Sequence, residues 1–263
     1  WGQMSYWGAQ VIISLFGAIP VVGDSLVEWI RGDFFVSDAT LNRFFALHVI
    51  AVPLALLLLV VLHLAALHEV GSNNPDGVEV KKKKDSKGRP LDGIPFHPYY
   101  TVKDIFGVGV LLVLFAFVIF YAPEFGGLFL EPDNFNPADP LVTPEHIVPV
   151  WYFTPYYAIL RAVPDKLGGV VLMGLAVMIL FTVPWLDRSK VKSIRYKGLG
   201  SKILLAVFVI AFIRLGMLGM SAGSYVQTIE SRIWTLAYFG FFILMPFVTK
   251  YEKTRPEPER VTK

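Results

Sequence analysis

The chain has 263 residues, of which 54% are hydrophobic and only 17% are charged, and its formal net charge is +3 at pH 7. This composition is too apolar for a water-soluble domain and is typical of an integral membrane protein. The chain contains no cysteine, which excludes an iron–sulfur cluster, a covalently attached c-type haem and a disulfide within it.

The first 43 residues contain no apolar stretch long enough to cross a bilayer. The sequence begins at Trp1 without a basic leader, so residues 1–20 do not resemble a secretory signal. We therefore expect a piece of a longer polypeptide, or one chain of a split one. Aromatic and small residues at about 4–16 and 25–31 predict two short surface or re-entrant helices.

Five later stretches each reach the roughly 20 apolar residues that a membrane-spanning helix needs. Pro53 removes one helical hydrogen bond from the first stretch, so we expect a bend there. Arg214 lies inside the fourth, where it could reach outward to the interface or pair with a partner subunit. The fold class predicted is all-α, an integral membrane bundle of five transmembrane helices with short surface helices on its outer face. The spans lie at about 44–68, 104–122, 168–186, 202–220 and 232–249.

Basic residues are concentrated in three segments, the loops 69–103 and 187–202 and the tail 250–263, which hold 18 of the 24 Lys and Arg. With five spans these segments fall on one side of the membrane, which the positive-inside rule makes the cytoplasmic side. The start of the chain and the loop 123–167 then face outward, into the periplasm if the membrane is a bacterial inner membrane; a mitochondrial inner membrane also fits. The lysine run at 81–84 indicates a solvated loop, or alternatively a lipid-headgroup contact.

Three histidines lie in or at the end of the first span. At about 100° per residue, His48 and His63 are about 60° apart around the helix and about 22 Å apart along it, which places them on one face. His68 lies about 200° from His48, on the opposite face. The first two suit axial ligation of two stacked haem irons; hydrogen-bonded structural histidines and a proton or ion path are the alternatives. His97 and His146 fall in loops, so the second axial ligands would come from outside this chain.

Five segments carry a resemblance to a known family. They are WGQMSYWGAQVI at 1–12, LHEVGSNNP at 67–75, IPFHPYYTVKD at 94–104, TPEHIVPVWYF at 143–153 and AILRAVPDKLGG at 158–169. Together they resemble cytochrome b of ubiquinol–cytochrome c oxidoreductase, in the order found in that family and over residues 1 to about 250. The resemblance implies the last five of the eight usual spans, and it implies that the first three are absent. The implied parts are 1–68, the surface helices with the haem-ligand span; 69–103, a basic cytoplasmic loop; 104–250, the C-terminal domain with four spans; and 251–263, a cytoplasmic tail.

The resemblance also implies roles for the three histidines. His48 corresponds to a ligand of a low-potential b-type haem near the outer face, and His63 to a ligand of a high-potential b-type haem nearer the cytoplasm. The family has either 13 or 14 residues between these ligands, and this chain has 14. His68, with Ser72 and Asp104, corresponds to the inner site, where these groups would hydrogen-bond ubiquinone and supply protons.

An outer site that oxidises ubiquinol is implied at the aromatic run after Pro149, where an apolar pocket would hold the ring and exclude water. By itself such a run would indicate interfacial anchoring. Many relatives have Glu at the position of Val150, so another group must accept the quinol proton. Glu145 is the nearest candidate; alternatively it is a solvated loop charge, and water or a histidine of the iron–sulfur partner takes the protons. The implied site residues are Pro149, Val150, Trp151, Tyr152, Phe153 and Tyr157, with Met4, Gly8 and Ile12 from the first surface helix.

The implied function is electron transfer from quinol, one electron passing to an iron–sulfur protein and the other across two b-type haems to quinone at the inner site, coupled to proton translocation. The implied partners are a Rieske-type iron–sulfur protein, a c-type cytochrome, the N-terminal half of cytochrome b, membrane lipid and a second copy of the complex, with no nucleic acid. Two alternatives are a non-redox transporter that uses the histidines as proton relays, and a scaffold that is competent only with its N-terminal half.

Overall fold

The computed structural model describes residues 2–144 and 147–261. Over this part of the chain the secondary structure is helical, without β-strands, as predicted. The α-helices are α1 (Gly2–Leu15), α2 (Gly23–Arg31), α3 (Asp38–Ala46), α4 (Val52–Val70), α5 (Tyr99–Tyr121), α6 (Thr154–Ala162), α7 (Lys166–Met178), α8 (Val183–Leu186), α9 (Leu199–Gly219) and α10 (Tyr225–Tyr251).

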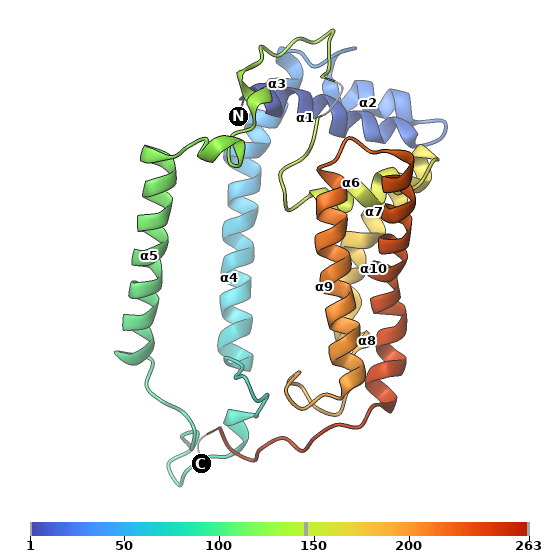
Figure 1. Cartoon of the computed structure of the whole chain (residues 1–263). Helices are drawn as coiled ribbons and strands as arrows, with labels where there is room; N and C mark the ends of the chain where they lie inside the picture. The colour runs from blue at the N-terminus through green and yellow to red at the C-terminus, as the bar shows by residue number, and fades with distance from the viewer. Residues whose placement is uncertain (1, 145–146, 262–263) are drawn as a thin grey trace.

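Five helices are long and apolar enough to cross a membrane, which confirms the predicted number of spans and makes the chain an integral membrane protein. Figure 1 shows these spans running along the molecule, with α1 and α2 across one end and the two basic loops and the tail at the other. This is the arrangement that the charge pattern predicted. The spans are Asp38–Val70, Tyr99–Tyr121, Lys166–Leu186, Leu199–Gly219 and Tyr225–Tyr251.

The first span is longer than predicted because α3 and α4 are joined by a π-helical turn, Leu47–Ala51. The amide of Val52 donates to the carbonyl of Leu47, five residues earlier. Pro53 explains this turn, because proline has no N–H to donate and its ring crowds the carbonyl four residues before it. In place of the bend predicted at Pro53, the helix has a wider, π-helical turn just before this proline, and His48 lies in that turn.

The core lies among α6, α7, α9 and α10. Ile159, Leu215, Tyr238 and Phe242 are each at most 1% exposed, and the Tyr238 hydroxyl donates to the carbonyl of Ala176 at 2.7 Å. By contrast, no residue in the hydropathy windows of α4 and α5 is buried inside the chain, and Figure 1 shows both helices standing apart from this core. Their side chains are therefore available to lipid or to other protein.

Charged contacts between the two basic loops and the tail hold together the end of the molecule opposite α1 and α2. Asp76 accepts from the Tyr196 hydroxyl at 2.8 Å and pairs with Arg195 at 3.1 Å. The hydrogen bond from Tyr196 is the main reason that the pKa of Asp76 is lowered. In the tail, Arg260 pairs with Asp92 at 2.9 Å. These contacts fasten the loop after α4 to the loop before α9 and to the tail.

The structure adds partners to two basic side chains. The lysines at 81–84 are exposed, as a solvated loop predicts, and Lys81 Nζ also donates to the carbonyl of Glu69 at 2.8 Å, at the end of α4. A cation is favoured at this position because the last helical carbonyls have no partners within the helix. Arg214, for which the sequence left the partner open, has one within the chain, since its Nε donates to Glu230 of α10 at 3.1 Å.

Candidate functional site

The three histidines of the first span are presented to the outside of the helix. His48 lies in the π turn, His63 in α4 and His68 in its last turn, and all three side chains are exposed. No group of three or more metal-binding side chains occurs among the residues that the structure describes. The arrangement therefore offers single imidazoles on an open apolar helix, rather than a complete metal site within this part of the chain.

The π turn changes the relative direction of His48 and His63. A π turn takes up about one residue more than an α turn, so the two side chains come to within about 40° of each other around the helix axis, instead of about 60°. Neutral imidazole nitrogen is a standard axial ligand of haem iron. Each histidine could therefore supply one ligand to a haem iron on the same face of the helix. A haem iron held by two histidines would need its second histidine from elsewhere, so these residues fit one half of each such site.

The three residues predicted for the inner site lie at the end of the molecule that carries the basic loops. His68 and Ser72 are at the C-terminal end of α4, and Asp104 is in the second turn of α5; Figure 1 shows these helix ends on the same side. No hydrogen bond among the described residues joins the three side chains. The structure thus places the three residues at the same end of α4 and α5, which are consecutive spans, but it does not bring their side chains into contact.

A cavity of about 420 Å³ at the opposite end unites much of the predicted outer site. The chain enters α6 through a turn at 151–153, where Trp151 and Tyr152 meet edge to face with ring centroids 5.5 Å apart. The hydroxyl of Thr154 donates to the Trp151 carbonyl at 2.6 Å and fixes this turn. The cavity is lined by Met4, Gly127, Leu128, Phe129, Glu131, Pro132, Asp133, Val148, Pro149, Val150, Trp151, Tyr152 and Met220.

Helix α1 is held over this cavity by contacts with the outer loop. The indole of Trp7 donates to the carbonyl of Val142 at 3.2 Å, and the Gln3 side chain accepts from the amide of Ala138 at 2.6 Å. These contacts explain how Met4 reaches the aromatic run, although about 145 residues separate them in the sequence.

The remaining predicted outer residues are placed less directly. Phe153 lies next to Tyr152, with ring centroids 4.8 Å apart, while Ile12 is 61% exposed. A Cβ on Gly8 would meet no described atom within 4 Å, so no close approach inside the chain explains this glycine. Tyr157 lies under Arg161 of α6. Glu145 lies outside the described residues.

Sequence analysis missed two carboxylates, Glu131 and Asp133, which line the same cavity as Val150. Both precede the aromatic run by more than 15 residues, so proximity in sequence favoured Glu145 instead. The available signal was that the outer loop carries several acids, any of which the fold could return to the site.

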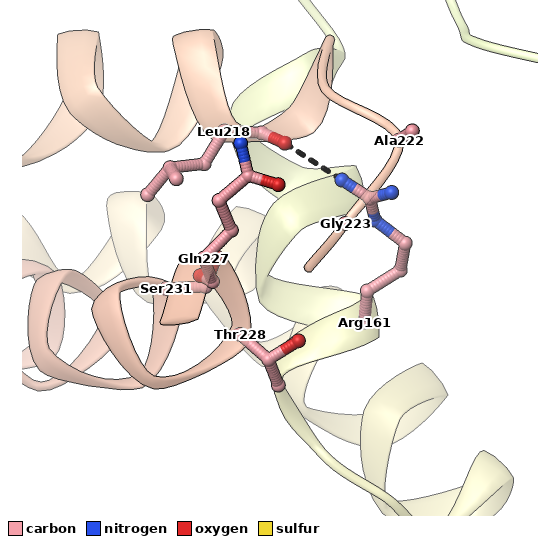
Figure 2. Close-up of a pocket in the computed structure, with 7 residues that line it drawn as sticks. All are labelled: Arg161, Leu218, Ala222, Gly223, Gln227, Thr228 and Ser231. Carbon is pink, nitrogen blue, oxygen red and sulfur yellow. Dashed lines mark hydrogen bonds between the residues drawn. The ribbon is translucent and has the colours of Figure 1, made fainter. Parts of the chain in front are cut away.

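Arg161 connects α6 to the end of α9, as Figure 2 shows. Its guanidinium donates to the carbonyls of Leu218 at 2.7 Å and Ser221 at 2.9 Å, and it lies 4.6 Å from the Tyr157 ring centroid. Its Nε is buried without a hydrogen-bond partner among the described residues. Carbonyls at a helix C-terminus need such a donor, so Arg161 holds α6, and with it the turn at 151–153, against the bundle.

The fold and these sites define a helical integral membrane protein with single imidazoles along its first span and an aromatic cavity at one end. Two family descriptions match the chain: Cytochrome b(N-terminal)/b6/petB over residues 1–138 and Cytochrome b(C-terminal)/b6/petD over residues 137–239. The chain belongs to the cytochrome b family.

Individual relatives agree with this assignment. Cytochrome b of Allochromatium vinosum is 57% identical over 270 residues, covering 100% of this chain and 65% of the relative. Cytochrome b of Rhodospirillum rubrum is 51% identical, covering 100% of this chain and 62% of the relative. A solved structure described as a hyperthermophilic respiratory Complex III has a TM-score of 0.82 at 36% identity, and the match covers 95% of this chain and 64% of that one. The chain thus spans just under two thirds of these relatives.

The comparisons correct one expectation. The resemblance had implied that the first three spans are absent and that the N-terminal half of cytochrome b is a separate partner. The N-terminal family description matches residues 1–138, so N-terminal domain sequence is part of this chain, and the absence of the first three spans is not supported. The N-terminal half is accordingly not proposed as a partner.

Proposed function

We propose that this chain is the cytochrome b subunit of a quinol–cytochrome c oxidoreductase, which oxidises ubiquinol at the outer cavity and reduces ubiquinone at the cytoplasmic end. The observation that carries the proposal is the cavity that joins Met4 of α1 to the run from Pro149 to Tyr152. It offers an aromatic hollow that is partly open to solvent, since Trp151 is 67% and Tyr152 is 51% exposed, and a flat ring can lie against such a surface. Family membership and the two aligned histidines support the same function.

His48 and His63 would each give one axial ligand to a b-type haem, one haem toward each end of the first span. When bound, the two haems would carry single electrons across the membrane. The exposed faces of α4 leave room for such groups between this helix and other protein. Because neutral imidazole brings no net charge into the apolar region, ligation costs less there than a charged ligand would.

The residues of the outer cavity would bind and orient the quinol. Trp151 and Tyr152 would supply aromatic walls and Met4 would close the side toward α1. Phe153, Tyr157, Gly8 and Ile12 do not line the cavity and would contribute from beside it. At the cytoplasmic end, His68, Ser72 and Asp104 would hydrogen-bond the quinone carbonyls and deliver two protons.

We further propose the setting in which the chain works. Its partners would be a Rieske-type iron–sulfur protein and a c-type cytochrome, in a complex that dimerises within membrane lipid. The basic loops and tail would face the cytoplasm of a bacterium, and the cavity would face the periplasm. Release of protons outside and uptake inside would then build a proton gradient. The parts would be residues 1–68, 69–103, 104–250 and 251–263, as set out from the sequence.

Absorption spectroscopy of the purified complex tests the proposal. His48→Leu and His63→Leu should each remove a different b-type absorption band at unchanged protein level, because each deletes one axial ligand. His68→Leu is the matched control on the same helix: it should keep both bands and slow quinone reduction. A wild-type complex without b-type bands would refute the proposal and would favour the non-redox transporter.

A further inference from the structure

The outer cavity contains a carboxylate in a position suited to a proton acceptor. Val150 lines the cavity with a side chain that can accept neither a proton nor a hydrogen bond. Glu131 and Asp133 line the same cavity from a different part of the outer loop. Both are half-buried, so each can meet a bound molecule on one side and water on the other.

The two carboxylates differ in what already binds them. Asp133 accepts a hydrogen bond from the Asn136 side chain at 3.2 Å, which occupies part of its acceptor capacity. No described residue donates to the carboxylate of Glu131. Glu131 also directly precedes the 3₁₀ turn η5 (Pro132–Phe135), yet its side chain does not cap that turn. Glu131 is therefore the carboxylate of the pair that is not engaged in the local structure.

The backbone of Glu131, by contrast, is fixed. Its carbonyl accepts from both the amide and the side chain of Asn134, each at 3.0 Å, and Asn134 is only 8% exposed. The turn η5 in turn packs against α1, the helix that brings Met4 to the cavity. A fixed backbone with an unengaged carboxylate lets the side chain rotate between the cavity and the outer water without moving the loop.

We propose that Glu131 accepts the first proton from quinol bound in this cavity, in place of the carboxylate that Val150 lacks. The inference rests on the proposed function and deepens it. The quinol O–H bond breaks, its electron pair stays on the quinol oxygen, and the proton forms an O–H bond with the Glu131 carboxylate. The resulting quinol anion would give one electron to the iron–sulfur centre and one to the haem that the proposed function supplies, and its remaining O–H proton would pass to water, which leaves the quinone. Neutral Glu131 then rotates outward and releases the proton to water.

Steady-state quinol oxidation by the whole complex, measured against pH, tests this assignment. Glu131→Gln keeps the size of the side chain and removes the acceptor, so the rate should fall at least about tenfold, within the range that general bases contribute. The rise of the rate with pH over the acidic range should also disappear. Glu131→Asp should recover part of the rate, and so should Glu131→Gln combined with Val150→Glu, because each returns a carboxylate to the cavity.

Glu124→Gln is the matched control, because it makes the same substitution in the same outer loop at an exposed residue outside the cavity lining. It should leave the rate and its pH dependence unchanged. A wild-type rate in Glu131→Gln, with both b-type absorption bands intact, would overturn the assignment and leave the proposed function standing. A tenfold loss in Asp133→Asn but not in Glu131→Gln would overturn it as well. A wild-type complex that does not oxidise quinol would instead defeat the proposed function.

Discussion

Gly219 is the position where the packing of α6 against α9 is most sensitive to a single added carbon. A Cβ on Gly219 would lie 2.0 Å from the carbonyl oxygen of Thr154 and 2.7 Å from its carbonyl carbon. These are backbone atoms at the start of α6, so no side-chain rotation can relieve the overlap. Gly219→Ala must push α6 away from α9 by roughly 1 Å, because Cβ atoms essentially never approach a neighbour within 3.0 Å.

The expected cost follows from these distances. Overpacking in a protein core costs about 1–3 kcal/mol, and the upper part of this range applies because backbone must move. Replacing glycine by alanine in a helix returns at most about 1 kcal/mol. The net loss of about 2 kcal/mol corresponds to a fall of about 4–8 °C in the unfolding temperature of a chain of this size. Thr154 also fixes the turn at 151–153, so the quinol oxidation proposed for this cavity should fall as well.

Thermal unfolding of the purified complex, followed by circular dichroism, measures this effect. Gly240→Ala in α10 is the matched control, because a Cβ there meets nothing within 4 Å; it should be neutral or raise the unfolding temperature slightly. If Gly219→Ala and Gly240→Ala unfold at the same temperature, α6 does not approach α9 as closely as the structure shows, and the argument fails.

Three further outcomes are expected. Tyr238→Phe removes the buried hydrogen bond to Ala176 and should cost about 1 kcal/mol, seen as a lower unfolding temperature with both b-type bands retained; no change would contradict the hydrogen bond. Arg161→Met leaves the carbonyls at the end of α9 without their donor and should lower the free energy of unfolding by about 1.5–3 kcal/mol. Equal unfolding temperatures for the wild type and the variant would show that the hydrogen bonds of Arg161 do not stabilise the packing of α6. Asp76 has a lowered pKa, so its stabilising contacts are present above its unfolded pKa of about 3.9 and are lost as the pH falls through the lower folded value. Limited proteolysis of the loop 71–98 should therefore increase in strong acid, and Asp76→Asn should show the increase already at neutral pH; identical cleavage of both proteins at neutral pH would be evidence against this role.

The spans could be predicted closely because a membrane imposes a local rule. The segment predicted at about 202–220 is the helix Leu199–Gly219, and the one predicted at about 168–186 is Lys166–Leu186. Transfer into a bilayer depends on the side chains of one segment and on its length, so no distant residue is needed to find it. The first span starts earlier than predicted because α3 and the π turn continue it, and hydropathy does not report that continuation.

Contacts between segments that are distant in the chain could not be predicted from the sequence. The sequence places Arg214 inside a span, but only the packing of α9 against α10 identifies Glu230 as its partner. Lys81 belonged to a run that indicated solvation, yet it caps α4. In both cases the deciding partner is fixed by the packing of elements and not by local composition.

The outer cavity shows the same division between sequence and structure. By itself the sequence determined an apolar membrane protein with five spans, histidines on one face of the first span and an aromatic run in the outer loop, because hydrophobicity and helical period are local properties. Only the tertiary structure showed which of the described carboxylates join that run. It brings Glu131 and Asp133 to the cavity that Val150 lines, because the outer loop folds back and its turn η5 packs against α1. That proximity in space depends on how the helices pack.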